Sequence, residues 1–233
     1  MRFAFAAALL WLAVSPARRE PSVIPWAWER REDLRFVGAG QTVAYYAGII
    51  TLDGARTVVE PRRNPLQLAK RAHRIAVIRI ETKSPTLDHQ QRRQTQEAIL
   101  RLSHHADELQ LDFDARSSER DFYRALLVAL RRETRQRLSI TALTSWCYDD
   151  RWLATLPIDE AVPMFFRMGR DEHVVRARLR RGEPIPEPRC RASAGISLDE
   201  PLPRIPPVAR VWVFNPERWT EESWNSARLR AAR

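Results

Sequence analysis

Eight short apolar runs, separated by helical or loop-like segments, constrain the fold of this chain more than any other feature. Their lengths and their β-branched and aromatic residues are typical of strands. They cover residues 23–29, 43–52, 74–81, 109–114, 138–145, 161–168, 192–198 and 209–215. Strands that alternate with helical segments indicate βα units and a parallel sheet. Eight such units predict an α/β fold, a compact single-domain (β/α)8 TIM-like barrel.

The connecting segments carry helix signals of different strength. The clearest helix is expected after the fourth run, where Ser118 and Asp121 form a capping-box-like start. Its predicted apolar face consists of Phe122, Ala125, Leu126, Ala129 and Leu130. Residues 90–105 predict a second, polar helix, and Asn215-Pro216 predicts the start of a last one. The proline-rich segments 183–189 and 201–207 are expected to be connections within one domain.

The first 17 residues have the pattern of a secretory signal peptide. A positive start at Arg2 precedes an apolar run over residues 3–14 and a small-residue cleavage site ending at Ala17. The run is shorter than the roughly 20 residues that span a bilayer. We therefore expect cleavage after Ala17, a periplasmic or secreted protein without stable membrane insertion, and a TIM-barrel-like domain over residues 18–233.

The chain has a net charge of +10, carried almost entirely by arginine, since Lys70 and Lys83 are its only lysines. Such a charge can favour nucleic acid, anionic lipid or acidic polysaccharide. The arginines are scattered, however, and no nucleic-acid-binding motif is present. The composition therefore indicates an arginine bias and no nucleic-acid partner, and it leaves the oligomeric state open.

The two cysteines, Cys147 and Cys190, can pair in an oxidising compartment. In the predicted barrel, however, Cys147 follows the fifth strand at the top and Cys190 precedes the seventh strand nearer the bottom. A disulfide needs α-carbons within about 7 Å of each other. The topology therefore favours two unpaired cysteines.

The segment 108–116 carries the strongest functional signal. Side chains alternate between the two faces of a strand, so Leu109, Leu111 and Phe113 share one face. Asp112 and Asp114 share the other face, which opens into the barrel mouth where barrel enzymes keep their chemistry. Two adjacent acids disfavour each other's charge, so we expect a raised pKa for at least one of them. The alternative is a helix cap beside a solvated strand end.

Further polar and aromatic residues are expected to converge on the same mouth as substrate-binding groups: Glu29, Arg79, Glu81, Trp146, Tyr148, Arg167 and Glu200. Carboxylates and flat rings together are typical of sugar sites. A structural alternative is that Arg79 and Glu81 pair in a polar core layer and that Trp146 packs beneath the following helix. No metal-ligand spacing and no glycine-rich phosphate loop is present, so neither a metal nor a cofactor is expected.

Four segments carry a resemblance to a known family. They read Leu-Gln-Leu-Asp-Phe-Asp (109–114), Leu-Ser-Ile-Thr-Ala-Leu-Thr-Ser-Trp (138–146), Ile-Asp-Glu (158–160) and Met-Phe-Phe-Arg-Met-Gly (164–169). The chain here resembles an uncharacterised family of bacterial exported proteins, known as domain of unknown function 3142. The resemblance implies a glycoside-hydrolase-like barrel and assigns no reaction.

The acid pair is also similar to the catalytic strand of chitinase-like glycosidases, Asp-x-Asp-x-Glu. In one register Arg116 takes the place of the glutamate, and arginine cannot act as an acid at neutral pH. In the other, Gln110 replaces the first aspartate and Asp114 becomes the acid. We expect an exported polysaccharide-cleaving barrel with Asp112 and Asp114 as catalytic residues and Glu29, Glu81 or Glu200 as a further carboxylate. The alternatives are a non-catalytic carbohydrate-binding or envelope-assembly barrel and, third, a lipid- or anion-binding surface protein.

Overall fold

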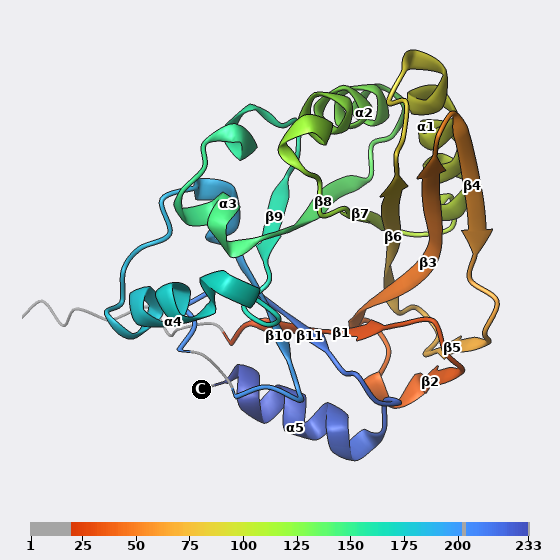
Figure 1. Ribbon diagram of the computed structural model, residues 1–233. Helices are drawn as coiled ribbons and strands as arrows, with labels where there is room; N and C mark the ends of the chain where they lie inside the picture. Colours follow the sequence, from red (N-terminus) through yellow and green to blue (C-terminus); the bar gives the residue numbers. More distant parts are fainter. Residues whose placement is uncertain (1–19, 202–203, 233) are drawn as a thin grey trace, which may run out of the picture.

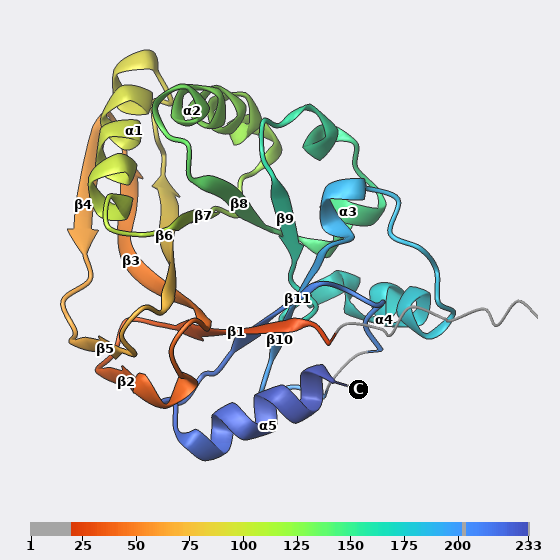
Figure 2. The ribbon, with the colours of Figure 1, turned by 180° about the vertical axis from the view of Figure 1, so that it is seen from behind.

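The chain forms a nearly closed barrel of eight parallel strands, described by a computed structural model for residues 20–201 and 204–232. The strands follow one another around the barrel in the order β10-β11-β1-β3-β6-β7-β8-β9 (Figures 1 and 2). A single bridge between Met164 and Gly195 brings β9 and β10 together at the seam. The predicted TIM-like architecture is confirmed, while the predicted signal peptide lies outside the described residues.

Each of the eight predicted runs overlaps one barrel strand. The strands are β1 (Ser22–Ala27), β3 (Thr42–Asp53), β6 (His73–Lys83), β7 (Glu108–Asp112), β8 (Arg137–Ala142), β9 (Glu160–Pro163), β10 (Ser193–Ser197) and β11 (Arg210–Phe214). Several strands end earlier than predicted. In particular, β8 ends at Ala142 and β9 at Pro163, because the chain turns into short loops at the barrel mouth.

Helices cover the outside of the barrel unevenly. Among the described residues, the α-helices are α1 (His89–Ser103), α2 (Arg120–Glu133), α3 (Thr144–Tyr148), α4 (Glu172–Arg180) and α5 (Glu221–Ala231). The β1–β3 connection instead contains β2 (Glu32–Leu34), which pairs with β5 (Leu66–Leu68). The β3–β6 connection also contains β4 (Arg56–Pro61), antiparallel to β3. Figure 1 shows α1 and α2 on the outside of β6, β7 and β8, and α5 beside β1, β10 and β11.

Two predicted helix starts are wrong. Before α2, the carboxylate of Glu119 accepts a hydrogen bond from the backbone nitrogen of Arg116. The capping box is therefore formed by Arg116 and Glu119, two residues before the predicted pair Ser118 and Asp121. The last helix does not begin at Asn215-Pro216. Thr220 caps α5 by accepting from the Ser223 nitrogen, whereas the Asn215 side chain stabilises the preceding turn.

The alternation predicted for β7 holds. Leu109, Leu111 and Phe113 are buried in the outer core, together with apolar residues of α1 and α2. Gln110 lies on the inner face and donates to the Ser139 hydroxyl at 3.3 Å. Because neighbouring strands alternate in the same way, the helices cover an apolar outer surface. The inner face is mixed, since the polar side chains of β7 and β8 lie beside an apolar cluster that includes Ile75, Val77 and Trp212.

Charged side chains close the barrel at the N-terminal ends of its strands. Arg210 donates to Glu160 at 2.7 Å and to Glu108 at 3.0 Å. Arg137 donates to Glu160 at 3.1 Å, and His73 lies 2.9 Å from Glu108. Glu160 is fully buried, and these partners compensate for the loss of water around its carboxylate. This ionic cluster makes the bottom of the barrel a structural layer and leaves the opposite end for a site.

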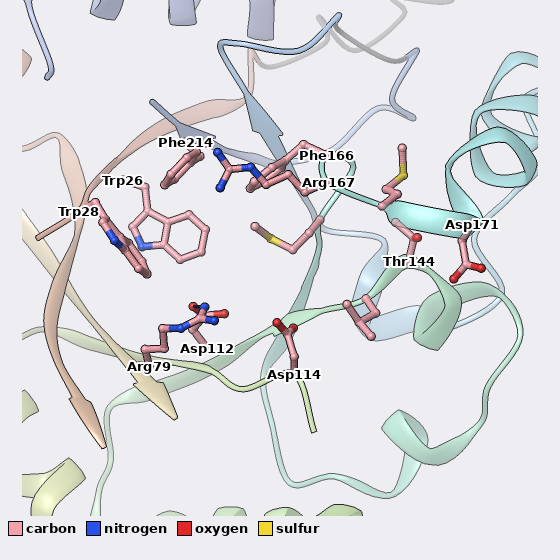
Figure 3. A pocket seen from close by; sticks show the side chains of 13 residues that line it. Trp26, Trp28, Arg79, Asp112, Asp114, Thr144, Phe166, Arg167, Asp171 and Phe214 are labelled. Carbon is pink, nitrogen blue, oxygen red and sulfur yellow. Dashed lines mark hydrogen bonds and ion pairs between the residues drawn. The ribbon is translucent and has the colours of Figure 1, made fainter. Parts of the chain in front are cut away.

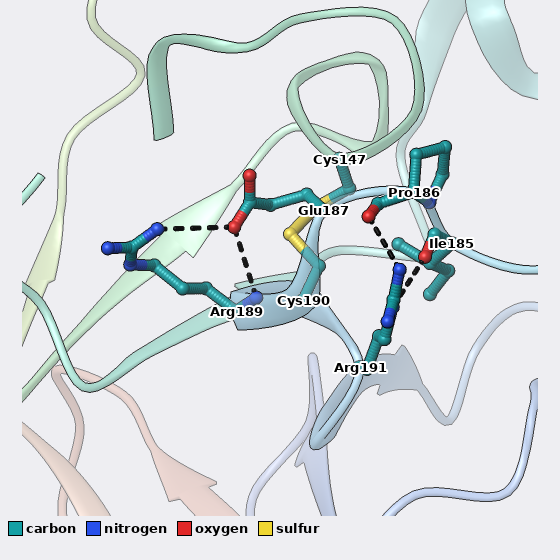
Figure 4. The surroundings of a disulfide bond; sticks show 7 residues. All are labelled: Cys147, Ile185, Pro186, Glu187, Arg189, Cys190 and Arg191. Carbon is teal, nitrogen blue, oxygen red and sulfur yellow. Dashed lines mark hydrogen bonds and ion pairs between the residues drawn. A yellow bond between two sulfur atoms is a disulfide. The ribbon is translucent and has the colours of Figure 1, made fainter. Parts of the chain in front are cut away.

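Cys147 and Cys190 form a disulfide, with α-carbons 6.0 Å apart (Figure 4). The sequence-based expectation of unpaired cysteines is therefore wrong. The chain before β10 passes alongside α3, where the Glu187 nitrogen donates to the Cys147 carbonyl at 3.3 Å. Both cysteines are buried in the same outer cluster as Ile185. The strand pattern of the sequence did not predict that the proline-rich segment before β10 packs against α3.

Candidate functional site

A cavity of about 470 Å³ opens at the C-terminal ends of the strands (Figure 3). Its lining comes from β1, β6, β7 and β11 and from the turns after β7, β8 and β9. The lining residues are Trp26, Trp28, Arg79, Asp112, Asp114, Leu143, Thr144, Met164, Phe166, Arg167, Met168, Asp171 and Phe214. Of the predicted site residues, the cavity brings together Asp112, Asp114, Arg79 and Arg167.

Asp112, the last residue of β7, is firmly held by its neighbours. One carboxylate oxygen accepts from Arg79 Nη1 at 2.9 Å, and the other accepts from the Thr141 hydroxyl at 2.9 Å. The residue is only 8% exposed. Burial alone would lower the pKa of Arg79, but the carboxylates of Asp112 and Glu81 outweigh that effect. The pKa is therefore raised, and the guanidinium remains charged. Asp112 is thus fixed from both neighbouring strands.

Asp114 is in a different state, two residues beyond the end of β7. Its carboxylate has no hydrogen-bond or ion-pair partner among the described residues, and it faces the cavity (Figure 3). Its carboxylate oxygens reach water at the cavity mouth, while neighbouring protein atoms displace part of the water around the side chain. This desolvation raises the pKa of Asp114, the nearby charge of Asp112 raises it further, and Arg79 opposes both. The site therefore holds one fixed acid and one open acid.

An aromatic wall, made of Trp26, Trp28, Phe166 and Phe214, lines the side of the cavity formed by β1, β11 and the turn after β9. Phe166 and Phe214 stack with ring centroids 5.6 Å apart, and Trp26 meets Trp28 edge to face at 6.1 Å. Trp26 is 3% exposed, and its indole nitrogen has no partner among the described residues. Figure 3 shows this wall across the cavity from Asp112 and Asp114.

Arg167 lies at the cavity rim in an unusual conformation. Its φ is +50°, in the left-handed region that non-glycine residues rarely adopt. Glu200 holds this turn by accepting from the Arg167 nitrogen at 3.0 Å. The guanidinium lies 4.9 Å from the Phe214 ring centroid and 3.8 Å from Asp199. Glu200, predicted to be a substrate-binding residue, thus lies outside the cavity lining and supports the turn at its rim.

Glu29 and Glu81 are also outside the lining. Glu29 accepts hydrogen bonds from the backbone nitrogens of Arg63 and Asn64 and from the Asn64 amide. Burial raises its pKa, but these hydrogen bonds outweigh that effect and lower it. Glu81 accepts from Arg79 Nε at 2.8 Å, so the anticipated Arg79–Glu81 pairing is present beside the cavity.

Trp146 and Tyr148 lie outside the cavity because the chain has already turned into α3. Trp146 packs edge to face against Trp152 with ring centroids 5.0 Å apart, as its structural alternative anticipated. Tyr148 is buried beneath Arg178, whose guanidinium lies 5.1 Å from the ring centroid. Leu143 and Thr144, just after β8, occupy the place at the barrel mouth that was predicted for Trp146 and Tyr148.

Sequence reasoning missed several lining residues, chiefly Phe166, Phe214 and Asp171. Phe214 ends β11 on the same face as Trp212, so strand alternation could have identified it. Asp171 lies in a turn between β9 and α4, and no periodic pattern marks that position.

In the parts of the chain that the structure describes, no three or more His, Cys, Asp or Glu residues are arranged to hold a metal ion. Likewise, none of the described helices has the length and apolar character needed to cross a membrane. No protein-family model and no curated protein matches the sequence of this chain. The cavity itself is therefore the basis for any assignment of function.

Proposed function

We propose that the protein is an exported, glycoside-hydrolase-like barrel that binds a polysaccharide in this cavity and cleaves it by acid/base chemistry. The observation that carries the proposal is the open carboxylate of Asp114 facing an aromatic wall. Indole and phenyl rings stack on the apolar faces of sugar rings, and a carboxyl group can protonate a glycosidic oxygen.

Asp114 is the proposed general acid. Its raised pKa favours the protonated form that this role needs, and no neighbouring group among the described residues occupies its oxygens. Asp114 would donate its proton to the glycosidic oxygen as the bond to the anomeric carbon breaks. Water would then add to that carbon, and the proton that it loses restores the acid.

Asp112 is better suited to positioning than to nucleophilic attack. Both of its oxygens already accept hydrogen bonds, from Arg79 and Thr141. A nucleophile must present an oxygen to the anomeric carbon. We therefore assign Asp112 the role of maintaining the charge and geometry around Asp114.

The arrangement favours one of the two registers considered for the chitinase-like pattern. Gln110 and Asp112 lie on the inner face of β7, Asp114 follows two residues beyond its end, and both aspartates line the cavity. Arg116 instead begins the turn before α2 and is not part of the lining. Asp114 is therefore the residue that corresponds to the acid.

Export is part of the proposal. A buried disulfide between Cys147 and Cys190 is consistent with the oxidising compartments outside the cytoplasm, where such bonds persist. N-terminal sequencing of protein recovered from the periplasm or medium should begin near Arg18. Intact protein retained in the cytoplasm would contradict this part.

The test is a cleavage screen of wild type and Asp114→Asn against a panel of bacterial and plant polysaccharides. The proposal predicts new reducing ends with wild type and their loss in the variant, with both proteins folded by thermal melting. Asp121→Asn on α2 is a matched control, because this side chain is exposed on the outer surface. Binding without cleavage by wild type would favour the alternative, a non-catalytic carbohydrate-binding or envelope-assembly barrel.

A further inference from the structure

The cavity is locally acidic although the chain as a whole carries a net charge of +10. Its lining contains the arginines Arg79 and Arg167 and the acids Asp112, Asp114 and Asp171. Both arginines have acidic partners. Arg79 is paired with Asp112 and Glu81, and Arg167 lies near Asp199. The lining therefore has no unpaired positive charge to attract an acidic ligand.

Asp171 is the acid in this cavity that the proposed chemistry does not use. It lies at the start of α4, where its backbone nitrogen donates to the Met168 carbonyl at 3.3 Å. Its side chain makes no capping hydrogen bond and has no ion-pair partner among the described residues. The positive end of α4 favours a negative charge at this position. The structure thus places an exposed carboxylate with unoccupied oxygens in the cavity wall.

A second feature of the cavity also indicates a ligand. The Trp26 indole is almost fully buried, yet its N–H lacks an acceptor in the described part of the chain. Figure 3 shows this ring reaching into the cavity from the aromatic wall. Aromatic rings bind sugar faces and also attract cations through their π electrons. Electron-rich rings and an open carboxylate together suit a ligand that combines apolar faces with positive charge.

We infer that the saccharide carries protonated amino groups and that Asp171 binds one of them. This inference rests on the proposed function, because it names the substrate class of the same site. In the view of Figure 3, Asp114 lies between the aromatic wall and Asp171. A chain of amino sugars spanning the cavity would place one ring on the aromatic wall, a glycosidic bond near Asp114 and the next amine at Asp171.

The inference is tested by binding, which does not depend on cleavage. Tetramers of β-1,4- and β-1,6-linked glucosamine are titrated into Asp114→Asn protein, followed by tryptophan fluorescence and calorimetry, below the pKa of the sugar amine. The fully N-acetylated tetramers are the neutral comparison. We expect at least one amine-bearing tetramer to bind about tenfold or more tightly than its acetylated form.

The variant Asp114→Asn/Asp171→Asn should abolish most of this preference, whereas Asp114→Asn/Asp121→Asn should keep it. Equal affinity for acetylated and free-amine tetramers, or tighter binding of an oligouronate, would overturn the amine inference while leaving saccharide binding intact. An unchanged preference without Asp171 would overturn the role of this residue. Failure of every tetramer, oligouronate and polysaccharide to bind would overturn the proposed function as well.

Discussion

Arg79 and Asp112 stand directly opposite each other in the register of β6 and β7, and their side chains form a 2.9 Å ion pair on the inner face of the barrel. Thr141 of β8 donates to the other carboxylate oxygen, so three adjacent strands fix one acid. This arrangement explains how a buried carboxylate is tolerated next to a second one. It also makes Arg79 a structural as well as an electrostatic support of the site.

Arg79→Gln is expected to destabilise the protein by about 1–3 kcal/mol, because it leaves the nearly buried Asp112 without its charged partner. Urea unfolding measures the loss. Arg63→Gln is the matched control, since Arg63 pairs with Glu60 on the surface and such pairs contribute at most about 1 kcal/mol. Equal stability of the two variants would mean that Asp112 does not depend on Arg79.

Asp114 should destabilise the fold at neutral pH. Its pKa is raised above the ordinary value of 3.8, so the folded protein binds this proton more tightly than the unfolded chain does. Protonation of Asp114 therefore makes its full contribution to the stability of the folded protein below pH 3.8. This contribution is lost as the pH rises through the folded-state pKa. Asp114→Asn removes the charge, and its stability relative to wild type should rise over this interval.

Urea unfolding of both proteins across that pH range checks this prediction. Asp121→Asn, an exposed site on α2, should show no comparable trend. A variant that loses stability at neutral pH would indicate that the Asp114 carboxylate holds the fold together through partners of its own, and the general-acid assignment would lose its electrostatic support.

The barrel was predictable because strand alternation depends on burial alone. In β7, each outward residue is apolar and each inward one is polar, so both the strand and the facing of Asp112 and Asp114 follow from period two. Helix starts were less predictable, since the cap of α5 at Thr220 depends on where the loop after β11 ends. Asn215-Pro216 is an equally plausible start when only local residues are considered.

The site was predictable in strands and in the few residues that follow them. Arg79 and Asp112 belong to strands, and Asp114 and Arg167 follow β7 and β9 by a few residues. Asp171 lies further along, in the turn that leads into α4, whose path depends on tertiary contacts. Trp146 and Tyr148 were misplaced because β8 ends three residues earlier than its apolar run suggests. One short turn was enough to move both rings from the mouth to the outer core.

The seam of the barrel should depend on Gly195. A Cβ at this position would lie 2.7 Å from the Met164 sulfur and 3.3 Å from the Pro163 carbonyl oxygen. Gly195→Val should therefore force β9 and β10 apart and cost about 1–3 kcal/mol, measured by thermal melting. Gly195→Ala should cost less, and adding Met164→Ala to it should recover part of the loss. No difference between valine and alanine would show that the seam is not closely packed.

The disulfide should make a large contribution to stability. It closes a loop between residues 43 apart in sequence, and cross-links of this kind typically stabilise by about 2–4 kcal/mol. Replacing both cysteines, Cys147→Ser with Cys190→Ser, should lower the midpoint of urea unfolding accordingly. Wild type unfolded in a strong thiol reductant should resemble the double variant, whereas the double variant itself should be insensitive to the reductant.

Because the Glu187 backbone nitrogen donates to the Cys147 carbonyl beside this bond, protease cleavage within residues 183–189 should also increase once the bond is removed. Unchanged stability under reduction would place the strength of this region in its apolar packing instead.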